Sequence, residues 1–372
     1  MSQFVFDLAT PDDDAQLRRI LAATPMDGAI RVSLRREPSY FGAAVLDGPF
    51  RQTIVARDQA SGRIAAMGAR SVRLRYVNGE PAAIGYLSGL RCLPEYRSRG
   101  IIPRGYRFFR KLHEDGRTGL YLTTIAEQNQ LAIGLLTSGR AGLPQYHDYG
   151  RFVTVAVPIG AVGGRLTWSS GKATIRPAEP SDLEAVFEFW SVIGARRQFF
   201  PAFSPDDFFR SSATFRDLRA HDLMLAFRGR RLVGTLAAWD QTAFRQIVVE
   251  RYSAALRWTR LAYNAWAAVR RQPRLPRAGQ PFRWLTAGLA AVEDDNVPVF
   301  EALLDALLIR AAGREWDCLL VGLHESDPLL ASVRRRQAIS YDARLYMVCW
   351  PDGESFREGL DHRPPYLELG CL

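Results

Sequence analysis

Lysine is almost absent from this sequence. Only Lys111 and Lys172 occur among 372 residues, so arginine supplies nearly all the positive charge behind a formal net charge of +10. We attribute this bias to genome composition more than to function. The excess positive charge favours anionic partners, and an anionic cofactor would satisfy it without nucleic acid.

Sequence patterns that hold metal ions are also absent. No CxxC or HExxH pattern occurs, and the five histidines are scattered. The four cysteines are Cys92, Cys318, Cys349 and Cys371. We therefore expect reduced thiols, mostly buried in apolar strands, and no metal.

Long apolar runs and targeting signals are missing as well. No run reaches the length needed to span a membrane, and Met1 to Asp14 lacks a basic region followed by an apolar one. We therefore expect a cytoplasmic protein. The length and the hydrophobic fraction of 47% suit a globular chain of two domains.

Apolar periodicity predicts alternating strands and helices. Strands are expected at 52–58, 63–76, 83–93, 119–126 and 151–159, with helices ending near residue 114 and covering 127–139. Asn78-Gly79 is a strong hairpin signal between two of these strands. The pattern indicates an α+β fold.

The pattern restarts after a segment rich in small residues. Pro11 aligns with Pro180 and Asp13 with Asp182, whereas the later match of Ala126 with His324 requires an insertion in the second copy. We predict a first domain at 1–160, a linker at 161–172, a second domain at 173–350 with a helical insertion at about 251–279, and a tail at 351–372. Each domain should contain a mixed, mostly antiparallel sheet flanked by helices.

The stretch LRCLPEYRSRGIIPRGYRFF, residues 90–109, reads as a strand, a basic glycine loop and a helix. Amides of a tight loop and a helix N-terminus form an anion site. Arg97, Arg99 and Arg104 add full charges, Gly100 permits close approach of a pyrophosphate, and Pro103 suits a first helical turn. The competing interpretation is a solvated basic turn.

These features resemble the GNAT acetyltransferase superfamily. Its signature is a strand ending in V-x-P, an aromatic residue, Q/R-x-x-G-x-G/A and a helix. Arg97 and Gly100 match it, whereas Ile102 stands where a small residue is usual. A second motif, Asn followed by Ala three residues later, matches Asn129 and Ala132. The resemblance covers about residues 4–159 and, more weakly, 173–350.

The resemblance implies an acyl-CoA-dependent N-acyltransferase using acetyl-CoA or another acyl-CoA. The backbone of Leu90–Cys92 would hold the pantetheine and polarise the acyl carbonyl. Asn129 would bind the pantetheine arm, cap a helix, or do both. The full set of implied cofactor-binding residues is Leu90, Arg91, Cys92, Arg97, Ser98, Arg99, Gly100, Ile101, Ile102, Arg104 and Asn129.

The catalytic acid and base stay open. The family often has a tyrosine acid seven residues after the asparagine, and Leu136 occupies that position here. Tyr146 and Tyr149 are the nearest substitutes, although packing tyrosines would look the same. Some tandem members use the terminal carboxylate as base, which makes Leu372 a candidate. Tyr86, Ser88 and His147 are further candidates for the base, whereas Glu80 is disfavoured at a hairpin tip.

The second copy replaces the basic loop with Glu293, Asp294 and Asp295. Three carboxylates would repel a pyrophosphate, so this copy is expected to be a degenerate partner that walls the acceptor cleft. We interpret the acidic turn as a helix N-terminus, with Asn296 as its cap and Pro298 in its first turn, rather than as a metal site.

Two segments fall outside the repeat. The insertion at 251–279 is rich in arginine and carries Tyr252, Trp258, Tyr263 and Trp266. Contact with nucleic acid or an anionic membrane is one interpretation, and packing of the aromatics on the protein itself is the favoured one. The tail at 363–372 is apolar at its end, so we expect it to dock, with an edge strand as one form.

Two other functions remain open. An aminoacyl-tRNA-dependent transferase could use the same fold, with 251–279 contacting tRNA. A non-catalytic CoA-binding or interaction protein would explain Ile102, Leu136 and the acidic second turn. The sequence leaves the oligomeric state open, and the acceptor could be a small-molecule or a peptide amine.

Overall fold

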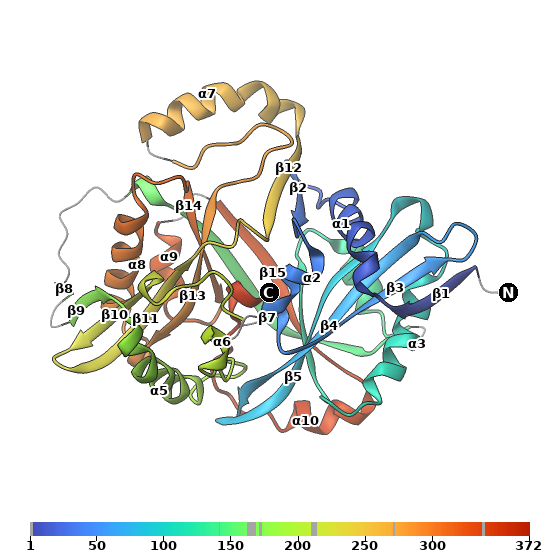
Figure 1. Cartoon of the computed structure of the whole chain (residues 1–372), viewed down its shortest axis with the longest axis horizontal. Helices are drawn as coiled ribbons and strands as arrows, with labels where there is room; N and C mark the ends of the chain where they lie inside the picture. Colours follow the sequence, from blue (N-terminus) through green and yellow to red (C-terminus); the bar gives the residue numbers. More distant parts are fainter. Residues whose placement is uncertain are drawn as a thin grey trace.

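The computed structural model describes residues 3–140, 142–161, 169–170, 173–209, 214–270, 272–336 and 339–372. Figure 1 shows two halves side by side, with helices on both faces of the strands. The first half contains β1 (Phe4–Leu8), α1 (Asp14–Ala23), β2 (Ile30–Arg35), α2 (Tyr40–Ala43), β3 (Phe50–Asp58), β4 (Ile64–Val77), β5 (Glu80–Cys92), α3 (Ile101–His113), β6 (Tyr121–Ala126), α4 (Gln130–Leu136) and β7 (Gln145–Pro158).

The second half repeats most of this order, with additions and without a described strand between α5 and α6 that would correspond to β2. It contains β8 (Ser169–Ser170), β9 (Ala173–Pro177), α5 (Leu183–Gly194), α6 (Asp206–Phe209), β10 (Leu223–Arg228), β11 (Arg231–Trp239), β12 (Gln246–Tyr252), α7 (Ala254–Arg270), β13 (Trp284–Val292), α8 (Val297–Ala311), β14 (Cys318–His324), α9 (Leu330–Arg334), β15 (Ile339–Cys349) and α10 (Glu354–Glu358).

One thirteen-stranded sheet runs through both halves of the described structure. Its order is β1-β3-β4-β5-β6-β15-β7-β14-β13-β11-β10-β9-β8. Only the β5–β6 and β13–β14 pairs are parallel in this sheet. The expectation of an α+β fold with a mixed, mostly antiparallel sheet flanked by helices is therefore confirmed.

The final strand of each half is exchanged. β15, from the end of the chain, lies between β6 and β7, whereas β7 pairs with β14 of the second half. Counted inward from the two edges of the sheet, the strands of the first half and of the second half consequently follow almost the same order, and each series ends with the last strand of the other half. The exchange joins the halves through the middle of the sheet, and the predicted division at residues 160 and 173 stays a prediction.

The internal repeat aligns as predicted. Short 3-10 turns begin at Pro11 and Pro180, and they end at Asp13 and Asp182. Each of these two carboxylates accepts two hydrogen bonds from an arginine, Arg57 in the first half and Arg176 in the second. β6 and β14 end at the matched residues 126 and 324.

A small second sheet bridges the two halves. β2 of the first half pairs antiparallel with β12 of the second, with Ile30 opposite Tyr252 and Arg35 opposite Gln246. The sequence did not indicate either strand, because both are short and their partners come from opposite halves. β12 thus leads into the predicted insertion at about 251–279, which contains the expected helix, α7.

The favoured interpretation of the insertion was partly wrong. Tyr252 is buried and Tyr263 packs beside it against the body, as expected. Trp258 and Trp266 instead point outward, with 78% and 50% of their surface exposed. None of the described helices combines the length and apolar character needed to cross a membrane.

The C-terminal tail docks between the halves, although not as an edge strand. The amide of Tyr366 donates to the carbonyl of Gln198, whose own amide donates to Pro364. Tyr366, Leu367 and Cys371 are buried, and the tail ends in a 3-10 turn at Leu369–Cys371. The cysteines are free: Cys318, Cys349 and Cys371 are buried, and Cys92 is half-buried.

Candidate active site

The basic loop lies between β5 and α3, as the sequence predicted. Ser98 and Gly100 have positive φ angles, 61° and 65°, so the chain turns sharply before the helix begins at Ile101. The amides of Gly100, Ile101 and Ile102 precede the first intrahelical hydrogen bond, and Pro103 contributes no amide. A Cβ at Gly100 would meet nothing within 4 Å, which shows that the backbone angle rather than crowding favours glycine here.

The three arginines of the loop differ in what they do. Arg97 is exposed, and its side chain makes no hydrogen bond or ion pair within the described residues. The guanidinium of Arg99 lies 5.5 Å from the ring centre of Tyr96. Arg104 donates to the carbonyls of Gly100 (3.1 Å) and Arg99 (2.8 Å). Arg104 therefore closes the loop, whereas Arg97 is free to meet an anion.

The strand before the loop carries a β-bulge. The register of β5 against β4 shifts between Met67 and Ala69, so that Gly89 and Leu90 together face Gly68. Gly89 has φ = 62°, which turns its peptide out of the regular ladder. Backbone donors at such a bulge are available to a ligand.

β5 and β6 separate beside this bulge. Their parallel pairing is confined to Gly85 with Tyr121 and Tyr86 with Leu122. Beyond these pairs, the hydroxyl of Thr123 donates to the carbonyl of Leu87 at 2.9 Å. All five residues at 88–92 are only half-buried, so this edge of β5 is accessible next to the basic loop.

An apolar cluster lines the space between β5, α3 and α4. Ile102 packs there with Leu90 and Ile133, so its bulk serves the helix packing. Leu136, which occupies the position of the family's tyrosine acid, is 5% exposed in the same cluster. Its side chain packs there and offers no proton donor. Asn129 caps α4, because its side chain accepts from the amide of Ala132 at 3.2 Å. The capping interpretation of Asn129 is thus confirmed.

The predicted catalytic tyrosines lie on opposite faces of the sheet. The hydroxyls of Tyr146 and Tyr106 are 2.6 Å apart, and burial raises the pKa of Tyr146 well above its usual value. Tyr149 packs against Phe199 and His324, and burial raises its pKa too. Burial thus keeps both phenols protonated, and the assignment of either one as the catalytic acid stays a prediction.

A group of polar residues lies on the opposite face of the separated strands. The hydroxyls of Tyr86 and Thr124 are 2.8 Å apart. Burial raises the pKa of Tyr86, while the positive charges of Arg75 and Arg245 act in the opposite direction. Arg245 donates to the main-chain oxygen of Leu372, which packs at the edge of the same apolar cluster as Tyr86. The structure therefore brings Tyr86 and Leu372 toward one region, and Tyr146 lies away from it.

Sequence reasoning missed a group of three potential metal ligands. His147, Cys349 and Glu354 offer atoms that all lie within 4.8 Å of one another. Burial, with the nearby Glu354 carboxylate, raises the pKa of the Cys349 thiol to about 12. The second oxygen of Glu354 accepts from Arg357 at 2.7 Å. The Nε2 atom of His147 lies 3.1 Å from the first carboxylate oxygen of Glu354, and the expectation of no metal stays a prediction.

The second half contains the same bulge, but there it is occupied. The register of β13 shifts against β11 between Thr235 and Ala237, and Leu289 has φ = 57°, as Gly89 does in β5. The amide of Leu289 donates to the carboxylate of Glu368 at 2.8 Å. Glu368 also accepts from the Tyr366 hydroxyl and the Gly370 amide, and it is 1% exposed. The backbone amide at this bulge, that of Leu289, is therefore already hydrogen-bonded to Glu368 of the protein's own C-terminal tail.

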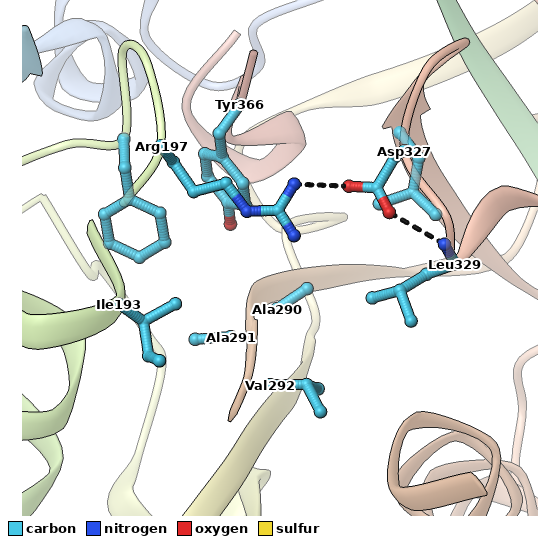
Figure 2. A pocket seen from close by; sticks show the side chains of 10 residues that line it. Ile193, Arg197, Ala290, Ala291, Val292, Asp327, Leu329 and Tyr366 are labelled. Atoms are coloured by element: carbon cyan, nitrogen blue, oxygen red, sulfur yellow. Dashed lines mark hydrogen bonds and ion pairs between the residues drawn. The ribbon is translucent and has the colours of Figure 1, made fainter. Parts of the chain in front are cut away.

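A buried arginine, Arg197, lies over the β13 residues that follow the bulge. Figure 2 shows the guanidinium of Arg197 extended toward Asp327, with Ala290, Ala291 and Val292 of β13 beside it. Arg197 donates to Asp327 at 3.2 Å and also pairs with Asp295 of the acidic turn. By the bulge alignment, Ala290–Val292 correspond to Leu90–Cys92. The stretch that lies at an accessible strand edge in the first half therefore lines only a small, largely enclosed pocket in the second, with Arg197 as one of its walls.

The acidic turn has the role that the sequence predicted. Asn296 caps α8 by accepting from the amide of Val299 at 3.1 Å, and Pro298 lies in the first turn. Glu293 and Asp294 pair with Arg231 and Arg196. The three carboxylates are thus neutralised by arginines of the same half.

Comparison with known proteins shows the fold. No protein-family profile and no curated protein sequence matches this chain. Among solved structures, a GCN5-related N-acetyltransferase from Sphaerobacter thermophilus matches with a TM-score of 0.57 and 14% identity, covering 100% of this chain and 99% of that one. N-myristoyltransferase from Saccharomyces cerevisiae with bound myristoyl-CoA matches with a TM-score of 0.59 and 10% identity, covering 94% of this chain and 79% of that one.

A third structure contains the fold within a larger protein. It is a fungal multi-domain GH3 β-N-acetylglucosaminidase with a GCN5-related glucosamine N-acetyltransferase region. The TM-score is 0.59 and the identity 13%, over 93% of this chain and 38% of that one, so this chain spans well under half of its length. The chain therefore has the GNAT fold, and the resemblance drawn from its motifs is confirmed at the level of the fold.

Proposed function

We propose that this protein is an acyl-CoA-dependent N-acyltransferase whose cofactor site lies in the first half, with acetyl-CoA as the preferred donor. The observation that carries the proposal is the half-exposed, bulged end of β5 running into a basic loop and the start of α3. The fold shared with acetyltransferases and an N-myristoyltransferase supports the acyl-CoA class.

The loop would bind the pyrophosphate of CoA. The amides of Gly100, Ile101 and Ile102 present partial positive charge at the helix start, and Arg97 supplies a full charge without losing an existing partner. Arg99 could also reach the anion, because its side chain is exposed even though its guanidinium stacks on the buried ring of Tyr96. Arg104 acts indirectly by holding the carbonyls of Arg99 and Gly100.

The reaction would be direct attack of an amine on the thioester. The accessible edge of β5 at Gly89–Cys92 would hold the pantetheine, and a bulge amide would donate to the carbonyl oxygen as it gains negative charge. The nitrogen–carbon bond forms as the carbon–sulfur bond breaks, which releases CoA as a thiolate. The acceptor would approach from the face of Tyr86 and Thr124, and its proton would leave on that side.

The second half would shape the acceptor side rather than bind a second CoA. Glu368 occupies its bulge, and Arg197 covers the adjoining strand. This arrangement predicts one acyl-CoA site in each chain. The acceptor class, a small-molecule or a peptide amine, would be selected by residues of both halves around Tyr86.

Isothermal titration with CoA, acetyl-CoA and longer acyl-CoAs tests the proposal. We expect one site of micromolar affinity and release of free CoA thiol when amines are added. The double variant Arg97→Glu/Arg99→Glu should bind at least about 100-fold more weakly, because two charge-assisted contacts are each worth about 1.5–3 kcal/mol.

The matched control for that variant is Arg228→Glu/Arg230→Glu. These arginines are exposed at the β10–β11 turn of the other half, so the same change of net charge should leave affinity unchanged. Absence of binding to any acyl-CoA would refute the proposal. Salt-sensitive binding of tRNA in its place would favour the aminoacyl-tRNA-dependent alternative, and CoA binding without turnover would favour the non-catalytic one.

A further inference from the structure

Helix α7 presents an apolar face to solvent. Its outer face consists of Trp258, Leu261, Ala262, Ala265, Trp266 and Val269, which are spaced to lie on one side of a helix. Trp258, Leu261 and Val269 are 78%, 72% and 82% exposed. Figure 1 shows α7 at the top of the view, above the second half and joined to it through β12 and the returning chain. At 1.5 Å per residue, the helix is about 25 Å long.

The inner face of α7 is already anchored. Leu256 and Tyr263 pack against Val249, Tyr252 and Leu275. Asn264 both donates to and accepts from the backbone of Leu275, each at 2.9 Å. The helix is thus fixed in place. On its outer face, the ring of Trp266 contacts Tyr263 of the same helix, whereas Trp258, Leu261 and Val269 are mostly exposed.

Positive charge surrounds this outer face. Residues 251–279 contain seven arginines and no aspartate or glutamate. The exposed members with described side chains are Arg251, Arg257, Arg270, Arg274 and Arg277. Arg257 and Arg270 lie on opposite flanks of the outer face, and the guanidinium of Arg257 is 5.7 Å from the ring centre of Trp258. An apolar stripe with arginines on both flanks is complementary to an anionic lipid surface.

We propose that the outer face of α7 docks this protein onto an anionic lipid bilayer. Trp258, Leu261 and Val269 would enter the interface, and the flanking arginines would reach the headgroups while their stems cover apolar surface. The proposal rests on α7 alone and does not depend on the proposed acyltransferase activity.

Other partners fit the outer face less well. Nucleic acid would use exposed arginines and stacked rings, but the aliphatic Leu261 and Val269 occupy the outer face, and Arg260 is turned inward to the carbonyl of Leu275 at 3.2 Å. A second copy of the chain would bring two arginine-rich surfaces together, and like charges repel. A lipid surface satisfies both the aliphatic and the cationic groups.

Vesicle flotation with the full chain tests this docking. We expect binding to vesicles of phosphatidylcholine mixed with phosphatidylglycerol, little binding to phosphatidylcholine alone, and weakening as salt is raised. The variant Trp258→Ser/Leu261→Ser/Val269→Ser should bind at least about tenfold more weakly, because it withdraws apolar area from the interface. In the variant Arg257→Gln/Arg270→Gln, the ratio of binding to anionic vesicles over binding to phosphatidylcholine vesicles should be smaller than in the wild type.

The matched control is Leu74→Ser/Val192→Ser, which removes two other exposed apolar side chains, at 53% and 51% exposure, and should bind vesicles as the wild type does. Quenching of tryptophan fluorescence by brominated lipid chains should occur in the wild type and be lost in Trp258→Phe/Trp266→Phe. Wild-type protein that stays unbound to anionic vesicles would overturn the proposal. So would unchanged binding by the triple serine variant, or a dimer or tRNA complex that depends on α7 while vesicles do not bind.

Discussion

The bulges of β5 and β13 have the same backbone geometry and opposite surroundings. Gly89 and Leu289 have φ angles of 62° and 57°, at matching register shifts. Residues 88–92 of β5 are half-buried, whereas Leu289 is fully buried and its amide is bonded to Glu368. A repeated fold can therefore keep a structural device in both copies and leave only one of them accessible to a ligand.

The loops after the two bulges differ in the same way. Arg97 meets no partner within the described residues, whereas Asp295 is paired with the buried Arg197. The first loop thus keeps a positive electrostatic potential that can attract an anion. In the second loop, the carboxylates are neutralised by ion pairs with arginines of the same half.

The largest expected effect comes from Gly89→Val. A β-branched residue disfavours a positive φ, so the bulge should flatten and its amide should turn away from the ligand. We expect kcat/KM to fall by about 100-fold or more, in line with loss of an oxyanion donor. The mirror variant Leu289→Gly should lower the free energy of unfolding, because it removes a fully buried side chain, but its folded fraction should keep the wild-type kcat/KM, because that bulge binds Glu368. Equal losses in both variants would show that the two bulges do not have different roles.

The next effect concerns the tail that closes the second bulge. Glu368→Ala would leave the Leu289 amide, the Gly370 amide and the Tyr366 hydroxyl without their acceptor. Each buried unsatisfied group costs about 1–3 kcal/mol, so the free energy of unfolding should fall by at least about 3 kcal/mol in urea titrations. The exposed Glu315→Ala is the control and should change it by less than about 0.5 kcal/mol.

The same carboxyl group should give stability an unusual pH dependence. Burial raises the pKa of Glu368, against the hydrogen bonds from Tyr366, Leu289 and Gly370, so the folded state holds this proton more tightly than the unfolded state. Its contribution should therefore fall as the pH rises from the ordinary glutamate pKa of 4.5 through the raised folded pKa, by at most about 1.4 kcal/mol per pH unit.

Glu368→Gln isolates that contribution, because it removes the titrating group. Subtracting its stability from that of the wild type between pH 4 and pH 8 should give a difference that declines with pH. A difference that rises with pH would mean that the carboxylate is better stabilised in the folded protein than its burial indicates.

The smallest effects are expected at two asparagine caps. Asn129→Ala and Asn296→Ala each remove a cap, of α4 and α8, and should each cost about 1 kcal/mol of unfolding free energy. Only Asn129→Ala should also weaken CoA binding, by a few-fold, if Asn129 contacts the pantetheine. Calorimetry on both variants measures this, and an unchanged affinity in Asn129→Ala would confine that residue to capping.

Much of the fold could be predicted from local signals. Asn78-Gly79 forms the expected hairpin between β4 and β5, and the internal repeat places the 3-10 turns at Pro11 and Pro180 correctly. The strand, basic loop and helix at 90–109 appear in the expected order. These features depend on residues close in the chain, whose conformational preferences act without distant partners.

The features that the sequence did not predict involve contacts between segments that are distant in the chain. β2 and β12 form a sheet only because the two halves bring them together. Glu368 is a tail residue with no motif around it, and only folding places it against Leu289. The outward rings of Trp258 and Trp266 could not be inferred, because an arginine-rich amphipathic helix can bury either face.

The sequence by itself determined the repeat, the α+β class and the position of the basic loop, because periodicity, turn residues and local charge are encoded over short stretches. Tertiary structure alone decided which bulge stays accessible, that β7 and β15 exchange partners, and that α7 turns its apolar face outward. The physical reason is that burial and the pairing of polar groups depend on which distant segments meet, and hydrogen bonds such as Leu289 to Glu368 form only after the chain has folded.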